Sequence, residues 1–146
     1  MRWRRSARIA MQGSRVVLDA SVVLRATVDR STAAVSFLER VRDAAVEASW
    51  PDLLFVEVAN GVATLARAGR VTERTASQVL AFTLAAPVRV VSVLELVVPA
   101  LAVASARSLS VYDACYVVLA EATDSTLVTA DRRLATATAN AHLLVD

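Results

Sequence analysis

Four short apolar runs, rich in valine and leucine, constrain the fold of this chain more than any other feature of its sequence. They cover residues 16–18, 88–93, 126–128 and 143–145, and none of them alternates with polar residues. A fifth strand is expected at residues 46–50, just before Pro51. Unbroken β-branched runs of this length, separated by longer segments, are typical of a parallel sheet that helices cover on both faces.

The segments between these runs have helical periodicity, and several carry residues that favour helix ends. Pro51 suits a first helical turn, and Gly69 suits a C-cap. Ser110, with Asp113 three residues later, matches a capping box. The predicted helices cover approximately residues 21–28, 32–45, 51–68, 72–84, 97–108, 110–123 and 132–140. The alternation predicts a doubly wound α/β domain with a roughly five-stranded parallel sheet.

The chain has 146 residues, which fits one domain. Its charge is unevenly distributed, because the first ten residues contain four arginines and no acid, whereas the rest carries 12 arginines and 14 acids. We therefore expect residues 1–12 to be a basic extension, disordered or non-native, and residues 13–146 to form the folded domain.

No segment has the pattern of a membrane span or a secretory signal. The most hydrophobic region, residues 79–104, is interrupted by Pro87, Arg89, Glu95 and Pro99. It therefore contains no uncharged apolar stretch near the roughly 18–20 residues that a spanning helix needs. The basic start is not followed by an apolar segment either. We expect a soluble, cytoplasmic protein without membrane contact.

The composition excludes several common chemistries. All 16 basic residues are arginine, so mechanisms that require lysine, such as P-loop phosphate binding and Schiff-base formation, are excluded. The three glycines form no G-x-G-x-x-G turn for a dinucleotide. Cys115 and His142 are the single cysteine and histidine, so they form no disulfide framework or Cys/His zinc site. Any metal site must use oxygen ligands.

Two acids lie at the ends of predicted strands. Asp19 directly follows the first run, and Asp131 follows Leu127-Val128-Thr129-Ala130 at the end of the fourth predicted strand, so their carboxylates converge if these strands are neighbours. Each acid could instead cap the helix that it precedes. Asp113 is also ambiguous, because the capping box at Ser110 explains it without any further role.

Glu57 lies on a predicted helix that is apolar around most of its circumference. It shares one narrow polar stripe with Asn60, Gly61 and Thr64, at helical spacing. Such a stripe faces either solvent or a polar cleft. A solvent face more often carries several charged residues than a lone carboxylate beside an amide, which favours the cleft.

Four segments that contain these acids resemble the motifs of PIN-domain nucleases, in the order found in that family. The segments are residues 16–22 (VVLDASV), 57–60 (EVAN), 112–116 (YDACY) with Leu119 and Ala120, and 129–134 (TADRRL). The resemblance covers about residue 14 to the end, and the size and segment pattern are similar to the VapC ribonuclease toxins of type II toxin–antitoxin modules. Each motif alone is weak, whereas four in order are fairly specific.

The resemblance implies that Asp19, Glu57, Asp113 and Asp131 are the acidic catalytic and metal-binding residues, with Asp19 and Asp113 as direct ligands. It implies that Ser21, Asn60 and Thr129 support them. The family fold implies a PIN-like nuclease domain over residues 13–146. It also implies an antitoxin partner, VapB-like and DNA-binding, and a homodimer.

The chemistry expected of such a site is hydrolysis of RNA phosphodiester bonds. Because the chain offers no suitable His, Lys or Cys, Mg²⁺ or Mn²⁺ on carboxylates would have to activate the water. Arginines near the acids would contact the RNA backbone, and the candidates are Arg25, Arg107, Arg132 and Arg133.

Three other functions compete with that of a ribonuclease toxin. An inactive PIN-like module would bind RNA or protein without cutting, although all four acids are present. A housekeeping RNA-processing nuclease would have the same site but no antitoxin. A HAD-type phosphatase is disfavoured, because Asp19-Ala20-Ser21 lacks the second Asp of D-x-D and the chain lacks the required lysine.

Overall fold

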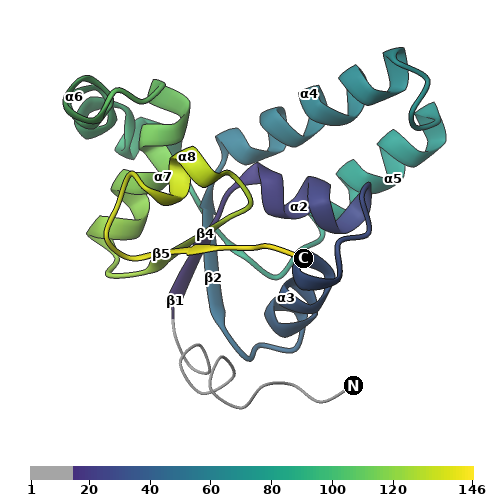
Figure 1. Ribbon diagram of the computed structural model, residues 1–146, viewed down its shortest axis with the longest axis horizontal. Coiled ribbons are helices and arrows are strands. Elements are labelled where there is room, and N and C mark those ends of the chain that lie inside the picture. Colours follow the sequence, from purple (N-terminus) through teal and green to yellow (C-terminus); the bar gives the residue numbers. More distant parts are fainter. Residues whose placement is uncertain (1–14) are drawn as a thin grey trace.

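A computed structural model describes residues 15–146 of the chain (Figure 1). The predicted basic extension, residues 1–12, lies outside the described residues. The elements in chain order are β1 (Arg15–Leu18), α2 (Ala20–Thr27), α3 (Thr32–Arg42), β2 (Glu47–Pro51), α4 (Leu53–Arg67), α5 (Glu73–Leu84), β3 (Arg89–Val91), η1 (Val93–Glu95), α6 (Val97–Arg107), α7 (Val111–Ala122), β4 (Thr126–Thr129), α8 (Arg132–Ala135) and β5 (Ala141–Leu143). Within residues 15–146, no helix is both long and apolar enough to cross a membrane.

The five strands form one sheet in the order β3-β2-β1-β4-β5, and all neighbouring pairs are parallel. This confirms the predicted α/β fold. In Figure 1, α2 to α5 lie on one side of the sheet and α6 and α7 on the other. The central strands β1 and β4 are direct neighbours, with Leu18 opposite Val128. The chain therefore leaves β1 and β4 at the same edge of the sheet, where open α/β folds bind ligands.

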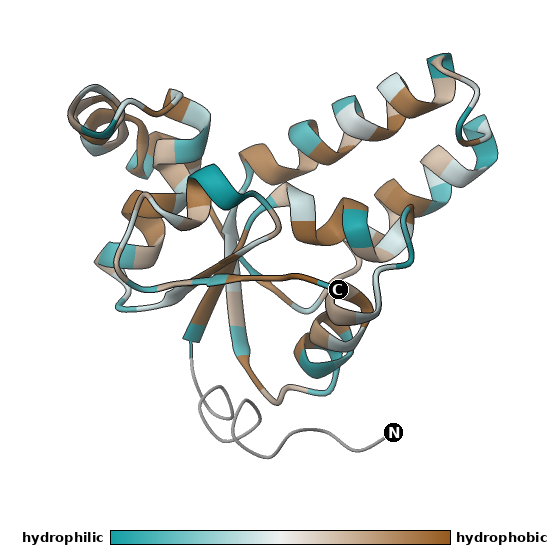
Figure 2. Ribbon diagram, viewed as in Figure 1, coloured by the Kyte–Doolittle hydropathy of each residue, from teal (hydrophilic) through white to brown (hydrophobic). Residues whose placement is uncertain are grey.

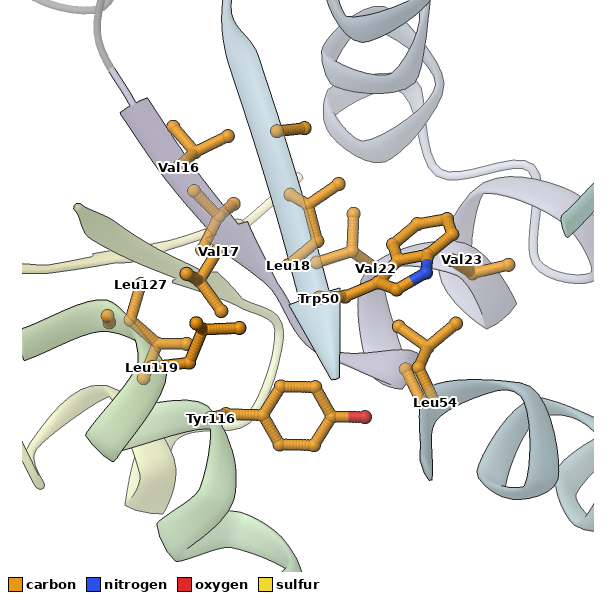
Figure 3. Close-up of a cluster of buried hydrophobic side chains, with 14 of the residues drawn as sticks. Val16, Val17, Leu18, Val22, Val23, Trp50, Leu54, Tyr116, Leu119 and Leu127 are labelled. Carbon is orange, nitrogen blue, oxygen red and sulfur yellow. The ribbon is translucent and has the colours of Figure 1, made fainter. Parts of the chain in front are cut away.

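The core packs tightly around the end of this central pair. Trp50 from β2, Leu54 from α4 and Tyr116 from α7 are among its largest fully buried side chains. Trp50 meets the ring of Phe55 edge-on, with 5.9 Å between ring centroids. Figure 3 shows Tyr116 beside this cluster, with its hydroxyl pointing toward α4. The apolar core therefore fixes α4 and α7 relative to the sheet edge.

Several predicted element ends are wrong. Pro51 ends β2, opposite Val91, instead of opening a helix, and Asp52 accepts a hydrogen bond from the Val93 backbone N–H at 2.9 Å. The apolar run at 88–93 was predicted to be a fully buried strand, but β3 is a short edge strand that leaves Arg89 and Val90 exposed.

The C-terminal elements also differ from the prediction. Helix α8 has four residues instead of nine. The Thr136 hydroxyl donates to the Arg133 carbonyl at 2.8 Å, and threonine and asparagine residues follow, which are weak helix formers. The last strand is Ala141–Leu143 instead of 143–145.

The predicted role of Gly69 in ending a helix is confirmed, one position after the C-cap Ala68. Gly69 has a φ of 71°, its N–H donates to Ala66, and the Arg70 N–H donates to Leu65, which is the Schellman arrangement. This cap ends α4 and turns the chain into α5, so the two helices form a hairpin that projects from the sheet (Figure 1).

Replacing Gly69 with alanine is expected to lower the free energy of unfolding by about 1 kcal/mol, because a residue with a Cβ is strained at positive φ. Urea denaturation measures this change. Gly69→Asn is the matched control. Its free energy of unfolding should fall by less than that of Gly69→Ala, since asparagine tolerates the left-handed region. Equal stability of Gly69→Ala and the wild type would contradict the assigned cap.

Candidate active site

Asp19 lies at the carboxyl end of β1 and is the N-cap of α2. Only 6% of the residue is exposed. Its Oδ1 accepts hydrogen bonds from the Ser21 backbone N–H at 3.1 Å and from the Ser21 hydroxyl, and its Oδ2 accepts from the Thr129 hydroxyl at 2.8 Å. Both carboxylate oxygens are therefore held by residues from two neighbouring strand ends.

The same two hydroxyls connect the loops after β1 and β4. The Ser21 hydroxyl accepts from the Ala130 N–H at 2.9 Å, and the Thr129 hydroxyl accepts from the Asp131 N–H at 3.0 Å. Through these bonds, Asp19 and the backbone of Asp131 belong to one network. The geometry thus places Ser21 and Thr129 in direct contact with Asp19.

Burial raises the pKa of Asp19 to about 6, although the hydrogen bonds from Ser21 and Thr129 act in the opposite direction. Loss of hydration disfavours the charged carboxylate more than these donors stabilise it. At neutral pH the ionised Asp19 carboxylate therefore lowers the stability of the fold, and a cation bound to it would offset that loss.

Glu57 lies in the second turn of α4 and faces α7. The Tyr116 hydroxyl donates to its Oε1 at 2.8 Å. Burial raises the pKa of Glu57, and the nearby charges of Asp113 and Asp19 raise it further, whereas the hydrogen bond from Tyr116 lowers it. The three carboxylates of Asp19, Glu57 and Asp113 therefore lie close enough to interact electrostatically.

Tyr116 was not singled out from the sequence as a contact of the acids. It lies three residues after Asp113, a spacing that places both side chains on one face of α7. It is also 1% exposed and belongs to the core. Burial and the charge of Glu57 raise the pKa of Tyr116, so its hydroxyl remains protonated and acts as a donor.

Asp113 lies in the first turn of α7. The helix is capped by Ser110, whose hydroxyl accepts from the Asp113 N–H at 3.0 Å. The cap thus uses the backbone of Asp113, and the carboxylate is engaged elsewhere, by the Arg133 guanidinium at 3.1 Å.

Asp131 follows β4 and caps α8. Its Oδ1 accepts from the backbone N–H groups of Arg133 at 2.8 Å and Leu134 at 3.3 Å. The capping role weighed for Asp131 is therefore present. The residue nevertheless lies beside the network of Asp19, through its own N–H.

The remaining candidate residues make no hydrogen bond to this network among the described residues. Asn60 is exposed one turn after Glu57 on α4, and Arg132 is exposed on α8. Arg25 pairs with Asp29 at 3.9 Å, near the end of α2.

Arg107 at the end of α6 binds Glu121 at 2.6 Å and the Ala137 carbonyl at 2.9 Å. Glu121 comes eight residues after Asp113 on α7, which corresponds to about 12 Å along the helix. The Arg107 guanidinium is therefore engaged in holding α6, α7 and the segment after α8 together.

A model of the PIN domain family matches residues 16–140. The chain belongs to the PIN domain family. Comparison with curated proteins finds no match. Members of this family are commonly nucleases and generally bind divalent metals.

Solved structures have the same fold. PAE2754 from Pyrobaculum aerophilum is 27% identical with a TM-score of 0.68, over 88% of this chain and 82% of that chain. A toxin–antitoxin complex from Klebsiella pneumoniae matches at 12% identity and a TM-score of 0.60, over 87% and 95% of the two chains. VapBC2 from Rickettsia felis, bound to a DNA fragment from its promoter, is 14% identical with a TM-score of 0.63, over 89% of this chain and 97% of that chain. The last two likenesses concern the fold alone.

The donor set of this PIN domain fits a hard divalent cation, because it consists of carboxylate oxygens. Among residues 15–146, however, no three acidic, cysteine or histidine side chains already form a metal-binding cluster. The expected convergence is thus incomplete. Arg133 holds Asp113, Tyr116 holds Glu57 and Asp131 caps α8, so that each of these carboxylates has its own partner.

Replacing Asp19 with asparagine is expected to stabilise the protein at neutral pH. The pKa of Asp19 is about 6 in the folded state, compared with a reference value of 3.8. Below a pH of 3.8, Asp19 is protonated in both the folded and the unfolded state and does not lower the free energy of unfolding. As the pH rises through the folded-state pKa of about 6, the free energy of unfolding falls by up to about 3 kcal/mol.

Urea denaturation in EDTA at about pH 8 and at about pH 4 measures this effect. We expect Asp19→Asn to be more stable than the wild type at the higher pH, with a smaller difference at the lower pH. Asp124→Asn, at an exposed acid, is the matched control. A loss of stability in Asp19→Asn at the higher pH would contradict the raised pKa.

Proposed function

We propose that this PIN domain is an Mg²⁺- or Mn²⁺-dependent endoribonuclease whose catalytic residues are Asp19, Glu57, Asp113 and Asp131. The observation that carries the proposal is the buried Asp19 carboxylate, which two hydroxyl groups hold rigidly despite its raised pKa. A charged group that costs stability is typical of a functional site. Asp19 lies at the ends of β1 and β4, at the edge of the sheet where open α/β folds bind ligands.

Asp19, Asp113 and Glu57 would hold the cation through carboxylate oxygens, beside Asp131. When bound, the cation would neutralise charge on the phosphodiester and lower the pKa of a water molecule. Ser21 and Thr129 fix both oxygens of Asp19, so this carboxylate needs little reorganisation. Tyr116 fixes one oxygen of Glu57, and its raised pKa keeps it a donor at neutral pH.

The RNA backbone would be held by arginines at the same edge of the sheet. Arg132 and Arg133 are exposed and follow Asp131 directly. Positive charge of this kind contributes to affinity for any sequence and weakens with salt. Asn60, one turn after Glu57, would orient water or phosphate from the other side.

Replacing Asp19 with asparagine is expected to reduce RNA cleavage in Mn²⁺ by about 100-fold or more, because removal of a charged ligand removes several kcal/mol of transition-state stabilisation. Cleavage of a single-stranded RNA by matched preparations measures this. Asp124→Asn should cleave as the wild type does. Equal cleavage by Asp19→Asn and the wild type would refute the assignment.

The same preparations distinguish the alternatives. Mn²⁺ should raise the Tm of the wild type but not that of Asp19→Asn. A protein that binds RNA without cutting it in Mg²⁺ or Mn²⁺ would be an inactive PIN-like module. A nuclease that does not arrest growth when expressed in a bacterial host would favour a housekeeping role over a toxin.

We also propose that the nuclease is the toxin of a toxin–antitoxin pair with a VapB-like, DNA-binding antitoxin. Two of the similar structures are of toxin–antitoxin pairs. A groove of about 520 Å³ between α2, α3 and α5 offers a docking surface, lined by apolar residues that include Val23, Val79 and Phe82. Trp50 also lines it, and among the described residues its buried indole N–H has no hydrogen-bond partner. An apolar helix of the antitoxin would fit this groove.

A homodimer is proposed on a different surface. Leu94, Val98 and Leu101 on η1 and α6 are among the most exposed large apolar side chains, and Figure 2 shows the hydrophobic character of α6. This face is separate from the groove at α5, so a second copy and an antitoxin can bind together. Sedimentation of the wild type and Leu101→Ser tests the assignment.

Replacing Phe82 with serine is expected to weaken antitoxin binding by about 10-fold or more, since a half-exposed aromatic ring in a groove is a typical binding hot spot. The first step is a search for an open reading frame immediately upstream that encodes a small DNA-binding protein. Its product is the probe, and calorimetry measures its affinity. Leu101→Ser is the matched control and should bind normally. Undiminished binding by Phe82→Ser would exclude this groove as the antitoxin site.

A further inference from the structure

Arg133 contacts two of the proposed site acids through different atoms. Its backbone N–H donates to Asp131 Oδ1 at 2.8 Å, and its guanidinium Nη2 donates to Asp113 Oδ2 at 3.1 Å. The first bond is part of the cap of α8 and fixes the main chain of Arg133. The second bond depends on the side chain alone, so the guanidinium can leave Asp113 while the backbone stays in place.

The ion pair with Asp113 has the properties of an exchangeable contact. The Arg133 side chain is 66% exposed and that of Asp113 is 21% exposed. An exposed arginine–carboxylate pair is weak, because water solvates both partners. Asp113 is also one of the carboxylates that repel Glu57, and the positive charge of Arg133 on Asp113 opposes this repulsion when no other cation is present.

We propose that Arg133 is an internal counter-ion of the active site. Its guanidinium occupies the Asp113 carboxylate until a divalent cation binds there, and it is then released to contact an RNA phosphate. The inference rests on the proposed metal-dependent nuclease function. It adds one point to that function, which is that Arg133 couples the binding of the cation to the binding of RNA.

The coupling follows from charge. A guanidinium and a divalent cation on the same carboxylate repel each other, so the cation must displace Arg133 and loses affinity in doing so. Removal of the guanidinium is expected to strengthen cation binding by about 3- to 10-fold, which is the range for partly screened charges near a protein surface. Removal should also weaken RNA binding, because one phosphate contact is lost. The two effects have opposite signs, and a purely structural role would not produce that pair.

The test measures Mn²⁺ affinity of the full chain by calorimetry, without RNA. Arg133→Gln should bind Mn²⁺ about 3- to 10-fold more tightly than the wild type. Arg133→Lys keeps the charge and should remain within about 2-fold. The matched control is Arg132→Gln, which removes the neighbouring exposed charge and should also remain within about 2-fold. Unchanged or weaker Mn²⁺ binding by Arg133→Gln would overturn the proposal.

Two further measurements separate the possible failures. If the wild type and Asp19→Asn both fail to bind Mn²⁺, the proposed function is wrong, and so is this inference, which depends on it. If the wild type binds Mn²⁺, Asp19→Asn does not, and Arg133→Gln shows no gain, the inference alone fails. Fluorescence anisotropy with a single-stranded RNA in Ca²⁺ should show weaker binding and a smaller salt dependence for Arg133→Gln. RNA affinity equal to that of the wild type would refute the release of Arg133 to phosphate.

Discussion

The hydrogen bonds from Ser21 and Thr129 to Asp19 join the two central strand ends, and the rest of the site depends on them. A parallel sheet brings the carboxyl ends of β1 and β4 to one edge, but this alone does not orient a side chain. Each hydroxyl donates to Asp19 and also accepts from the backbone that leads to Asp131. The position of one carboxylate is therefore set by the register of the sheet.

This arrangement concentrates negative charge where the fold cannot neutralise it fully. Burial of Asp19 and the mutual repulsion of Glu57 and Asp113 oppose folding, and the surrounding core offsets that cost. Tyr116 and Arg133 reduce the repulsion locally, one by a hydrogen bond and the other by an ion pair. Each of these two acids thus has a partner of its own in the described structure.

The sequence predicted the fold well, because its main signal was the set of apolar runs, and runs of this kind determine which residues a parallel sheet buries. The order of acids after strands also placed Asp19 and Asp131 after the neighbouring strands β1 and β4, as in the structure. Local ends were less predictable. Pro51 suits both a strand end and a helix start, and pairing with Val91 decides between them. The length of α8 depends on competition by Thr136 for a backbone carbonyl. The partners Tyr116 and Arg133 come from contacts over 59 and 20 residues, which local patterns do not contain.

Tyr116 is at once a core side chain and the hydrogen-bond partner of Glu57. Its ring packs with the cluster that includes Leu54 and Trp50, so a cavity made among those residues can rotate or shift the hydroxyl that Glu57 accepts from (Figure 3). A substitution that disturbs the packing of the core can therefore also disturb the hydrogen bond to Glu57. At a buried apolar position on α4 or β2, such a substitution can displace the partner of Glu57 without changing any of the acids.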